Sequence, residues 1–397
     1  MERGQLADLL GAARPGAGAA ARIVEEDSPA RFMAAFSEAL AAGGNLFLAN
    51  PAWRAQERAE LARVAGLGRG AERGWLMIPS GGSGGSVKFA RHDGWTVAAA
   101  VEGFRRHFGM DRVNSLGVLP LHHVSGFMAW MRSALTGGAY LPHAWKDLEA
   151  GRFPEELPRD CCLSLVPTQL HRLLSSGESI EWLRRFRVIF VGGGPAWSAL
   201  LDEGARHRLP LSPCYGATET AAMAAALRPE DFLRGVRGCG PALPHARIDF
   251  VEGIVRVSGE SLYRGYFPED AAGRTWVTED MGGFNADGSL VILGRRDSLI
   301  VTGGKKVAPL EVEAALRRSG EFEDVAVIGL PDPEWGEMVV ACHPGEGRSP
   351  RAAEVEAALS GLSAFKRPKR YVAITPWPRN EQGKIDRACL ARLASGA

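Results

Sequence analysis

Five short runs of apolar residues, each ending in glycine, proline or polar residues, constrain the fold of this chain more than any other feature. They are WLMIPS (75–80), SLGVLPL (115–121), CCLSLVP (161–167), RVIFVGGG (187–194) and LPLSPCYG (209–216). Amphipathic segments with helical spacing, such as 96–109 and 167–176, stand between them. Buried strands that alternate with helices form βα units around a parallel sheet. We therefore predict an α/β fold with a ligand site at the carboxyl ends of the strands.

The character of the sequence differs on either side of this core. Residues 1–70 are rich in Ala, Arg and Glu, with apolar positions at helical spacing, and predict a helical lead-in. Beyond about residue 236, segments 246–259 and 289–301 alternate apolar and polar residues between turn signals. This pattern predicts a β-rich subdomain next to the βα units.

A further change of pattern predicts a second domain. Residues 309–362 contain a helical segment, two strand segments and a second helical segment, which together form a small α+β unit. We place the boundary beside Arg295. The prediction is a large N-terminal domain, 1–295, with sheets packed on helices, and a small mobile C-terminal domain, 296–397.

Composition excludes several classes of partner. Among the 397 residues, 47 Lys and Arg balance 46 Asp and Glu, so there is no strong net charge to attract nucleic acid or a membrane surface. The six cysteines form no CxxC pair, which favours reduced thiols. No run of about 18 apolar residues occurs, and charges interrupt the first residues. We expect a soluble cytoplasmic protein with no nucleic-acid or membrane partner.

The segment SGGSGGSVK, residues 80–88, follows an expected strand. Its glycines leave backbone N–H groups accessible to phosphate oxygens, and Lys88 adds a positive charge. No Lys-Ser/Thr pair follows the glycines, so it is not a Walker A loop. Taken alone, the segment fits a phosphate loop and a plain flexible connection about equally well.

The segment YGATET, residues 215–220, also follows a strand. Tyr215 offers an aromatic face for a base, Thr218 a hydroxyl for a phosphate and Glu219 a carboxylate for Mg²⁺. A helix start capped by Thr218 is an equally good interpretation of these residues alone.

Two segments further along the chain carry charged residues at expected strand ends or turns. Asp280 and Arg295 have the groups to bind ribose hydroxyls, although such a pair is more often a structural ion pair. Lys384 lies in a turn, RNEQGKIDR (379–387), where a lysine is usually just solvated.

In this order, the segments resemble the motifs of the acyl-adenylate-forming superfamily, which includes acyl-CoA synthetases, peptide-synthetase adenylation domains and luciferases. The family motif TSGSTGxPK falls on 80–88, YGxTE on 215–219, TGD on 278–280, GRxD on 294–297, GGxxVxPxEIE on 303–313 and NxxGKxxR on 380–387. Further segments, LPLHHVSG (119–126), LVPTQLHRLL (165–174) and GGGPA (192–196), resemble the o-succinylbenzoate CoA ligases of menaquinone and phylloquinone synthesis.

The resemblance implies an AMP-forming acid–thiol ligase that uses ATP, coenzyme A and Mg²⁺, with o-succinylbenzoate as the acid. It implies catalytic roles for Lys384, Thr218, Glu219 (the Mg²⁺ ligand) and His123. The implied ATP and AMP contacts are Ser80, Gly81, Gly82, Ser83, Gly84, Gly85, Lys88, Gly193, Gly194, Pro195, Tyr215, Gly216, Thr218, Asp280 and Arg295. The implied acyl pocket contains His123, Ser125, Thr168, Gln169 and Gly216. Asp297 is the implied hinge, and Gly303 and Gly304 line the implied CoA tunnel.

Three alternatives remain open at this stage. They are another aryl- or acyl-CoA ligase, for example one acting on a benzoate, a standalone adenylation enzyme that loads a carrier protein, and a non-catalytic paralogue. For His123, a hydrogen-bonded core histidine is the plain alternative, and Lys366, Arg367, Lys369 and Arg370 fit either CoA phosphates or a solvated face. A homodimer is also left open.

The chain departs from the family pattern at several positions. Gly81 and Gly84 replace hydroxyl residues of the phosphate loop, and Val87 replaces its proline. Glu279 stands where the TGD motif has glycine. The resemblance also implies a reduced N-terminal subdomain, because the phosphate loop begins only at residue 80.

Overall fold

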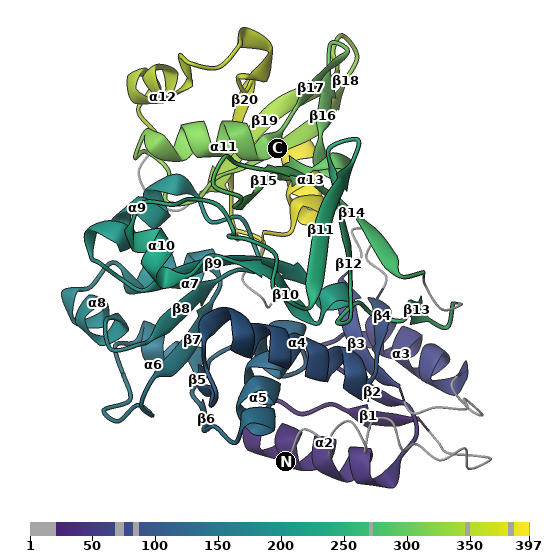
Figure 1. Cartoon of the computed structure of the whole chain (residues 1–397). Coiled ribbons are helices and arrows are strands. Elements are labelled where there is room, and N and C mark those ends of the chain that lie inside the picture. Colours follow the sequence, from purple (N-terminus) through teal and green to yellow (C-terminus); the bar gives the residue numbers. More distant parts are fainter. Residues whose placement is uncertain are drawn as a thin grey trace.

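The computed structural model describes residues 21–67, 75–81, 87–269, 273–345, 350–379 and 385–396. Three sheets and their helices form a large N-terminal part, and a fourth sheet with its own helices forms a smaller C-terminal part (Figure 1). The predicted α/β class, with a β-rich subdomain and a small α+β unit after it, is therefore confirmed. In the described part of the chain, no helix combines the length and apolar character needed to cross a membrane.

The first sheet has the strand order β1-β2-β3-β4-β13. Strands β1, β2 and β3 run parallel, whereas β4 is antiparallel to both β3 and β13. Its strands are β1 (Arg22–Val24), β2 (Leu46–Leu48), β3 (Leu76–Gly81), β4 (Val87–His92) and β13 (Tyr266–Phe267). The expectation of a helical lead-in over 1–70 is thus only partly right: helices α2 (Pro29–Ala42) and α3 (Ala55–Leu67) are present, but β1 precedes α2 and β2 lies between α2 and α3. Each of these two strands has only three residues, too few to show a strand period.

The second sheet has the order β10-β9-β8-β7-β5-β6, all parallel except β10. Its strands are β5 (Asn114–Gly117), β6 (Tyr140–Pro142), β7 (Cys161–Leu165), β8 (Val188–Val191), β9 (Leu211–Ala217) and β10 (Ala222–Ala226). Helices α4 (Gly94–Phe108) and α5 (Val124–Thr136) pack between this sheet and the first. Helix α4 begins at a capping box between Asp93 and Thr96 and ends at Gly109, which has a positive φ.

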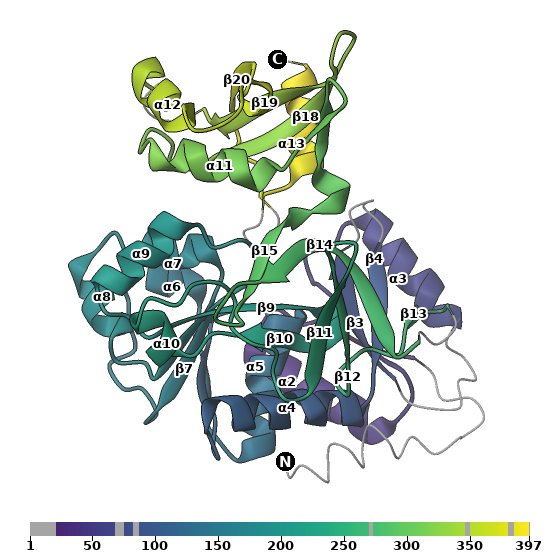
Figure 2. The ribbon, with the colours of Figure 1, turned by 45° about the horizontal axis from the view of Figure 1, so that its top comes forward.

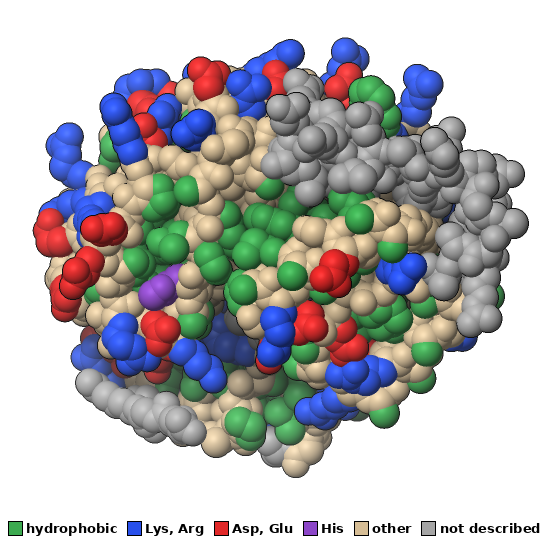
Figure 3. Space-filling view, turned by 90° about the horizontal axis from the view of Figure 1, so that it is seen from below, with side chains coloured by type: hydrophobic (Ala, Val, Ile, Leu, Met, Phe, Trp, Pro, Cys, Tyr) green, Lys and Arg blue, Asp and Glu red, His purple; other side chains and the backbone are tan. Residues whose placement is uncertain are grey.

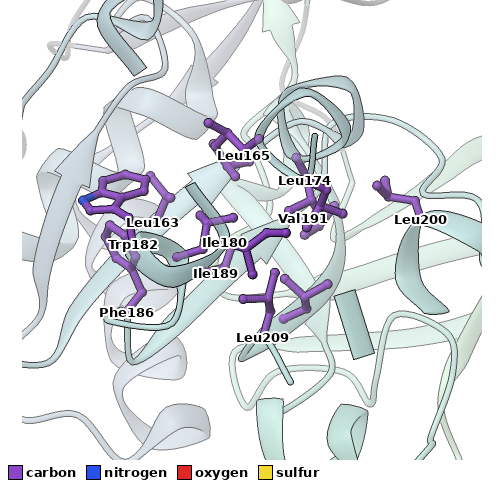
Figure 4. Packing of buried hydrophobic residues seen from close by; sticks show 14 of the residues in the cluster. Leu163, Leu165, Leu174, Ile180, Trp182, Phe186, Ile189, Val191, Leu200 and Leu209 are labelled. Carbon is purple, nitrogen blue, oxygen red and sulfur yellow. The ribbon is translucent and has the colours of Figure 1, made fainter. Parts of the chain in front are cut away.

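The other face of the second sheet carries the largest hydrophobic core. Leu163, Leu165, Ile189 and Val191 from β7 and β8 pack there with Trp182 and other side chains of the covering helices (Figure 4). These helices are α6 (Trp145–Glu149), α7 (Pro167–Leu173), α8 (Gly177–Leu183), α9 (Ser198–Arg206) and α10 (Pro229–Leu233). The continuous apolar runs of the sequence are therefore strands buried on both faces.

The third sheet is antiparallel, in the order β11-β12-β14-β15. Its strands are β11 (Ala246–Val251), β12 (Ile254–Gly259), β14 (Thr275–Phe284) and β15 (Leu290–Arg295). After β15, the 3₁₀ turn η2 (Arg296–Ser298) leads directly into β16 of the fourth sheet, and Figure 2 shows the C-terminal part beyond β15.

The fourth sheet has the order β17-β16-β19-β18, with β20 paired to β19. Its elements are β16 (Ile300–Thr302), β17 (Lys305–Val307), α11 (Pro309–Arg318), β18 (Ala326–Asp332), β19 (Gly336–Pro344), α12 (Ala352–Leu359), η3 (Ala364–Lys366), β20 (Arg370–Ile374) and α13 (Arg387–Ser395). Helices α11 and α12 cover one face and α13 the other. The Arg317 guanidinium of α11 lies 5.1 Å from the ring centroid of Trp197, which precedes α9, so the two parts of the chain touch.

Charged side chains of both signs stand side by side around the face seen in Figure 3, and hydrophobic side chains lie toward its centre. This mixture agrees with the net charge of +1 in the sequence. All six cysteines are unpaired.

Candidate active site

The turn that follows β9 projects the candidate phosphate and metal residues. Strand β9 ends at Ala217, and Thr218, Glu219 and Thr220 form the 3₁₀ turn η1 (Thr218–Thr220) before β10 returns antiparallel. A Cβ on Gly216 would lie 1.8 Å from the carbonyl oxygen of Ala222, so only glycine allows the two strands this approach. The helix start considered for this segment is thus a single 3₁₀ turn.

Glu219 is the most enclosed acidic residue of this region. Glu219 is only 4% exposed to solvent. Carboxylate oxygen Oε1 accepts hydrogen bonds from the Ser80 hydroxyl at 2.8 Å and from the Tyr266 hydroxyl at 2.6 Å. No ion pair to Glu219 occurs within the described residues. A buried carboxylate without a basic partner fits a hard divalent cation such as Mg²⁺.

The rest of a Mg²⁺ shell would have to come from elsewhere. Over the described ranges, no group of three or more His, Cys, Asp or Glu side chains is arranged to hold a metal ion. Mg²⁺ typically takes one or two carboxylates and completes its shell with substrate phosphates and water. Glu219 therefore fits a metal that arrives with the nucleotide.

The candidate phosphate loop connects β3 and β4. Ser80 pairs with Lys88 across this hairpin, and Gly81 is exposed at the end of β3. Gly82, Ser83, Gly84 and Gly85 lie outside the described residues. The hydroxyl of Ser80 reaches Glu219, so the start of the loop and the candidate metal ligand are in direct contact.

A hydrogen bond and an ion pair join the candidate adenine and ribose residues. The Tyr215 hydroxyl donates to Oδ2 of Asp280 at 2.7 Å. Asp280 pairs in register with Arg295, whose guanidinium lies 3.6 Å from Oδ1 of Asp280. Burial, followed by the nearby Asp280 charge, raises the pKa of Tyr215, so its hydroxyl stays a donor at neutral pH. The ion pair considered for Asp280 and Arg295 is therefore present, and it lies beside the tyrosine.

Gly193, Gly194 and Pro195 are exposed just beyond the end of β8. Strand β8 is the parallel neighbour of β9, so these residues emerge at the same sheet edge as Tyr215. A Cβ on the preceding Gly192 would lie 2.7 Å from Sγ of Cys214, which shows how closely the two segments approach.

The candidate hinge residue Asp297 forms hydrogen bonds with Arg295. Its two carboxylate oxygens accept hydrogen bonds from Nε and Nη2 of Arg295 at 2.9 and 2.5 Å. The neighbouring Arg296 makes a similar pair with Glu279, at 2.9 and 2.8 Å. Glu279, the departure from the family motif, thus joins β14 to the turn that leads into the C-terminal part.

The candidate acyl residues emerge at the same edge from β5 and β7. His123 precedes α5, whose third residue is Gly126, and Ser125 lies in the first turn. A Cβ on Gly126 would lie 2.2 Å from the carbonyl oxygen of Pro120, so this glycine allows the helix to start close to the preceding loop. The rings of His122 and His123 are 4.4 Å apart, and burial lowers the pKa of His122 to about 4, which keeps it neutral.

Thr168 and Gln169 open helix α7 directly after β7. Oε1 of Gln169 accepts a hydrogen bond from the backbone N–H of Val166 at 3.0 Å, so part of this side chain caps the helix. Strands β5 and β7 are parallel neighbours, which brings His123 and Thr168 to one side of the sheet.

The candidate CoA residues lie in the C-terminal part. Gly303 and Gly304 form the turn between β16 and β17, with φ values of +54° and +75°. The Gly303 N–H donates to the carbonyl oxygen of Trp335 at 2.8 Å. Lys369 has its Nζ 5.7 Å from the centroid of the Trp335 ring. Lys384 lies outside the described residues, between Arg379 and Ile385, which form a β-bridge.

Two interactions of the site were not anticipated from the sequence. Tyr266 donates to Glu219, although no sequence motif indicated a role for this tyrosine. The pairing of Glu279 with Arg296 was missed as well. The sequence carries only weak signals for these two interactions. For the first it is a tyrosine beside a glycine near the end of a β-rich segment, and for the second it is opposite charges in neighbouring motifs.

Comparison with known families agrees with this arrangement of fold and site. Residues 71–267 match the AMP-binding enzyme model, and residues 311–384 match the AMP-binding enzyme C-terminal domain. The chain belongs to the AMP-binding enzyme family.

Curated relatives include CoA ligases for aromatic acids. The 2-succinylbenzoate–CoA ligase of Listeria monocytogenes serotype 4b (strain F2365) is 30% identical over 330 residues, covering 79% of this chain and 68% of the relative. The indoleacetate–CoA ligase of Aromatoleum aromaticum is 32% identical over 307 residues, covering 72% of this chain and 60% of the relative.

Solved structures share the fold over nearly the whole chain. The o-succinylbenzoate CoA synthetase (MenE) of Bacillus subtilis, in complex with the acyl-adenylate intermediate OSB-AMP, superposes with a TM-score of 0.79 and 23% identity, covering 98% of this chain and 91% of the other. ATP-bound MatB from Rhodopseudomonas palustris superposes with a TM-score of 0.77 and 23% identity over the same shares.

Proposed function

We propose that this chain ligates o-succinylbenzoate to coenzyme A through an acyl-adenylate, releasing AMP and pyrophosphate, in menaquinone or phylloquinone synthesis. The proposal rests on two sets of hydrogen bonds. Ser80 and Tyr266 both donate to the Glu219 carboxylate, and Tyr215 donates to Asp280. This arrangement supports binding of a nucleoside triphosphate at the carboxyl ends of the strands of the second sheet. The relatives named 2-succinylbenzoate–CoA ligase support the acid.

In the first half-reaction, a carboxylate oxygen of the acid attacks the α-phosphorus of ATP. A new P–O bond forms, and the bond to the leaving pyrophosphate breaks. Acid and triphosphate repel each other, so the site must supply cations and N–H donors that act on the pentacoordinate phosphorus. We assign this role to Lys384 at the α-phosphate and to Lys88, Thr218 and the glycine-rich loop at the phosphates.

Glu219 would hold Mg²⁺, which supplies charge neutralisation to the phosphates when it is bound. Tyr215 would cover the adenine face, while Gly193, Gly194 and Pro195 would contact its edge. Asp280 and Arg295 would hold the ribose hydroxyls. The hydrogen bond from Tyr215 supports this division because it fixes the orientation of the Asp280 carboxylate.

In the second half-reaction, the CoA sulfur attacks the acyl carbon. A C–S bond forms, the bond to AMP breaks, and the thiol proton passes to solvent. We propose that domain 296–397 rotates about Asp297 between the two steps, which withdraws Lys384 and brings Gly303 and Gly304 to the pantetheine path. A glycine pair supports this role because neither residue has a side chain to obstruct the thiol.

The acyl pocket in this proposal contains His123, Ser125, Thr168, Gln169 and Gly216. His123, Ser125, Thr168 and Gln169 follow the neighbouring strands β5 and β7, and Gly216 lies near the end of β9 in the same sheet. ATP, coenzyme A and o-succinylbenzoate are the small-molecule partners, and we place the reaction in the cytoplasm. Sedimentation of the purified chain tests whether a homodimer forms.

The test is ATP-dependent pyrophosphate release with o-succinylbenzoate and with a panel of benzoates, indoleacetate and fatty acids. Each acid is measured with and without CoA, and AMP and thioester are followed by mass. The proposal predicts preference for o-succinylbenzoate and thioester formation only with CoA. A preference for another acid would support the ligase chemistry but refute o-succinylbenzoate as the substrate. If the acyl group were transferred to a carrier protein instead of CoA, CoA would be refuted as the acceptor.

A further inference from the structure

The pairing of two strands distant in sequence places Tyr266 between the candidate metal ligand and the candidate phosphate lysine. Strand β13 is antiparallel to β4, with Tyr266 opposite Ala90. Lys88 lies two residues from Ala90 on the same face of β4, at the diagonal position where long side chains meet across a sheet. Nζ of Lys88 lies 5.2 Å from the centroid of the Tyr266 ring, which is a cation–π distance.

The hydroxyl of the same tyrosine reaches Glu219. It donates to Oε1 at 2.6 Å, a short charge-assisted hydrogen bond. Within the described residues, the two hydroxyls that donate to the Glu219 carboxylate, those of Ser80 and Tyr266, both bond to Oε1, which leaves Oε2 for another partner.

The segment before β13 holds Glu219 from its backbone side. The N–H of Tyr263 donates to the carbonyl oxygen of Glu219 at 2.8 Å. The Tyr263 ring packs edge-on against the Tyr266 ring, with centroids 5.0 Å apart. Side chain and main chain of Glu219 are thus fixed by one short segment.

We propose that Tyr266 is a positioning residue for metal–nucleotide binding, orienting the Glu219 carboxylate so that Oε2 faces the cation and holding Lys88 toward the phosphates. This inference rests on the proposed function and adds to it a residue that links the two charged groups of the site. Glu219 needs such a partner because an unoriented carboxylate would pay an ordering cost each time the metal binds.

The test uses Mn²⁺ as a spectroscopic probe in place of Mg²⁺. Binding of Mn²⁺ in the presence of ATP is titrated by electron paramagnetic resonance, and ATP binding in EDTA is measured by calorimetry. Tyr266→Phe removes the hydroxyl and keeps the ring over Lys88. We expect about tenfold weaker Mn²⁺–ATP binding, the effect of losing a charge-assisted hydrogen bond to a buried group, with ATP binding in EDTA unchanged.

Tyr371→Phe is the control, because it removes the hydroxyl of a 42% exposed tyrosine on β20, in the C-terminal part of the chain. We expect this variant to bind Mn²⁺–ATP like the wild type. Tyr266→Leu also removes the ring, and should weaken ATP binding in EDTA as well. Thermal unfolding of each variant shows whether it is folded. A structural defect alone would lower the unfolding midpoint and weaken Mn²⁺–ATP binding and ATP binding in EDTA alike.

Mn²⁺–ATP affinity of Tyr266→Phe within twofold of the wild type would overturn the inference. Tyr266→Leu serves as the second variant if Tyr266→Phe does not fold, and we expect at least about tenfold weaker Mn²⁺–ATP binding from it. Mn²⁺–ATP affinity of that variant within twofold of the wild type would also overturn the inference. Failure of the wild-type protein to bind Mn²⁺–ATP would refute the proposed function itself.

Discussion

Gly304 allows the proposed CoA path to be tested apart from the stability of the fold. Its φ is +75°, a region that costs a residue with a Cβ about 1–2 kcal/mol. A Cβ built there meets no atom within 4 Å, so a substitution clashes with nothing in the protein. Gly320, after α11, has a φ of +70° and equally open surroundings. Leucine at either position should therefore cost a similar stability.

The experiment compares Gly304→Leu with Gly320→Leu. For a unit of roughly 100 residues, each kcal/mol lowers the unfolding midpoint by about 4–8 °C, and we expect the two variants to shift alike. Pyrophosphate release with o-succinylbenzoate and ATP alone measures the first half-reaction. Thioester formation from supplied acyl-adenylate and CoA measures the second.

We expect both variants to release pyrophosphate at wild-type rates. Only Gly304→Leu should lose thioester formation, because its side chain fills the space through which the thiol must pass. Normal thioester formation in Gly304→Leu would refute the assignment of Gly303 and Gly304 to the CoA path. Equal loss in Gly320→Leu would assign the defect to stability.

Three further predictions concern catalysis, the hinge and pH. Lys384→Ala should abolish adenylation and spare thioester formation from supplied acyl-adenylate; equal loss of both half-reactions would contradict the rotation of the C-terminal domain. Glu279→Gln should speed tryptic cleavage at 295–298, because it breaks the paired hydrogen bonds to Arg296. Asp249→Asn, which breaks the similar exposed pair with Arg256, should leave that cleavage unchanged, and equal effects would argue against a local brace. Burial lowers the pKa of His92, His107, His122 and His245 to about 4, below the value of about 6.5 in the unfolded chain. Between these pH values the unfolded state binds more protons than the folded state, so the free energy of unfolding should fall as the pH falls from about 6.5 toward 4, by up to about 1.4 kcal/mol per pH unit for each histidine. Urea unfolding at pH 7 and at pH 5 measures this difference. Equal free energies of unfolding at the two pH values would contradict the prediction.

Sequence patterns predicted the parts of the fold that depend on local periodicity. The strand around Ile189 is apolar throughout and the strand around Leu163 is apolar except at Ser164, because both faces of the sheet are buried; this pattern predicted both strands. Strands β1 and β2 were missed, since three residues carry no period. In the first sheet β1 pairs with β2 and β2 with β3, and each pairing joins strands that a helix separates in the sequence.

The candidate site was predictable where a motif is contiguous. Tyr215, Thr218 and Glu219 follow one another along the chain, and the structure brings Ser80 and Asp280 to them. The hydrogen bond from Tyr266 was not predictable, because it depends on β13 pairing with a strand more than 170 positions earlier. Pairings between such distant segments leave no local trace in a single sequence.

The central claim is that one site first makes and then consumes an acyl-adenylate. The most direct measurement incubates the protein with o-succinylbenzoate and ATP without CoA, then adds CoA and follows both species by mass. We predict that o-succinylbenzoyl-AMP accumulates on the protein and converts to the CoA thioester on addition of CoA, with release of AMP. Absence of the adenylate, or an adenylate that CoA does not consume, would contradict the claim.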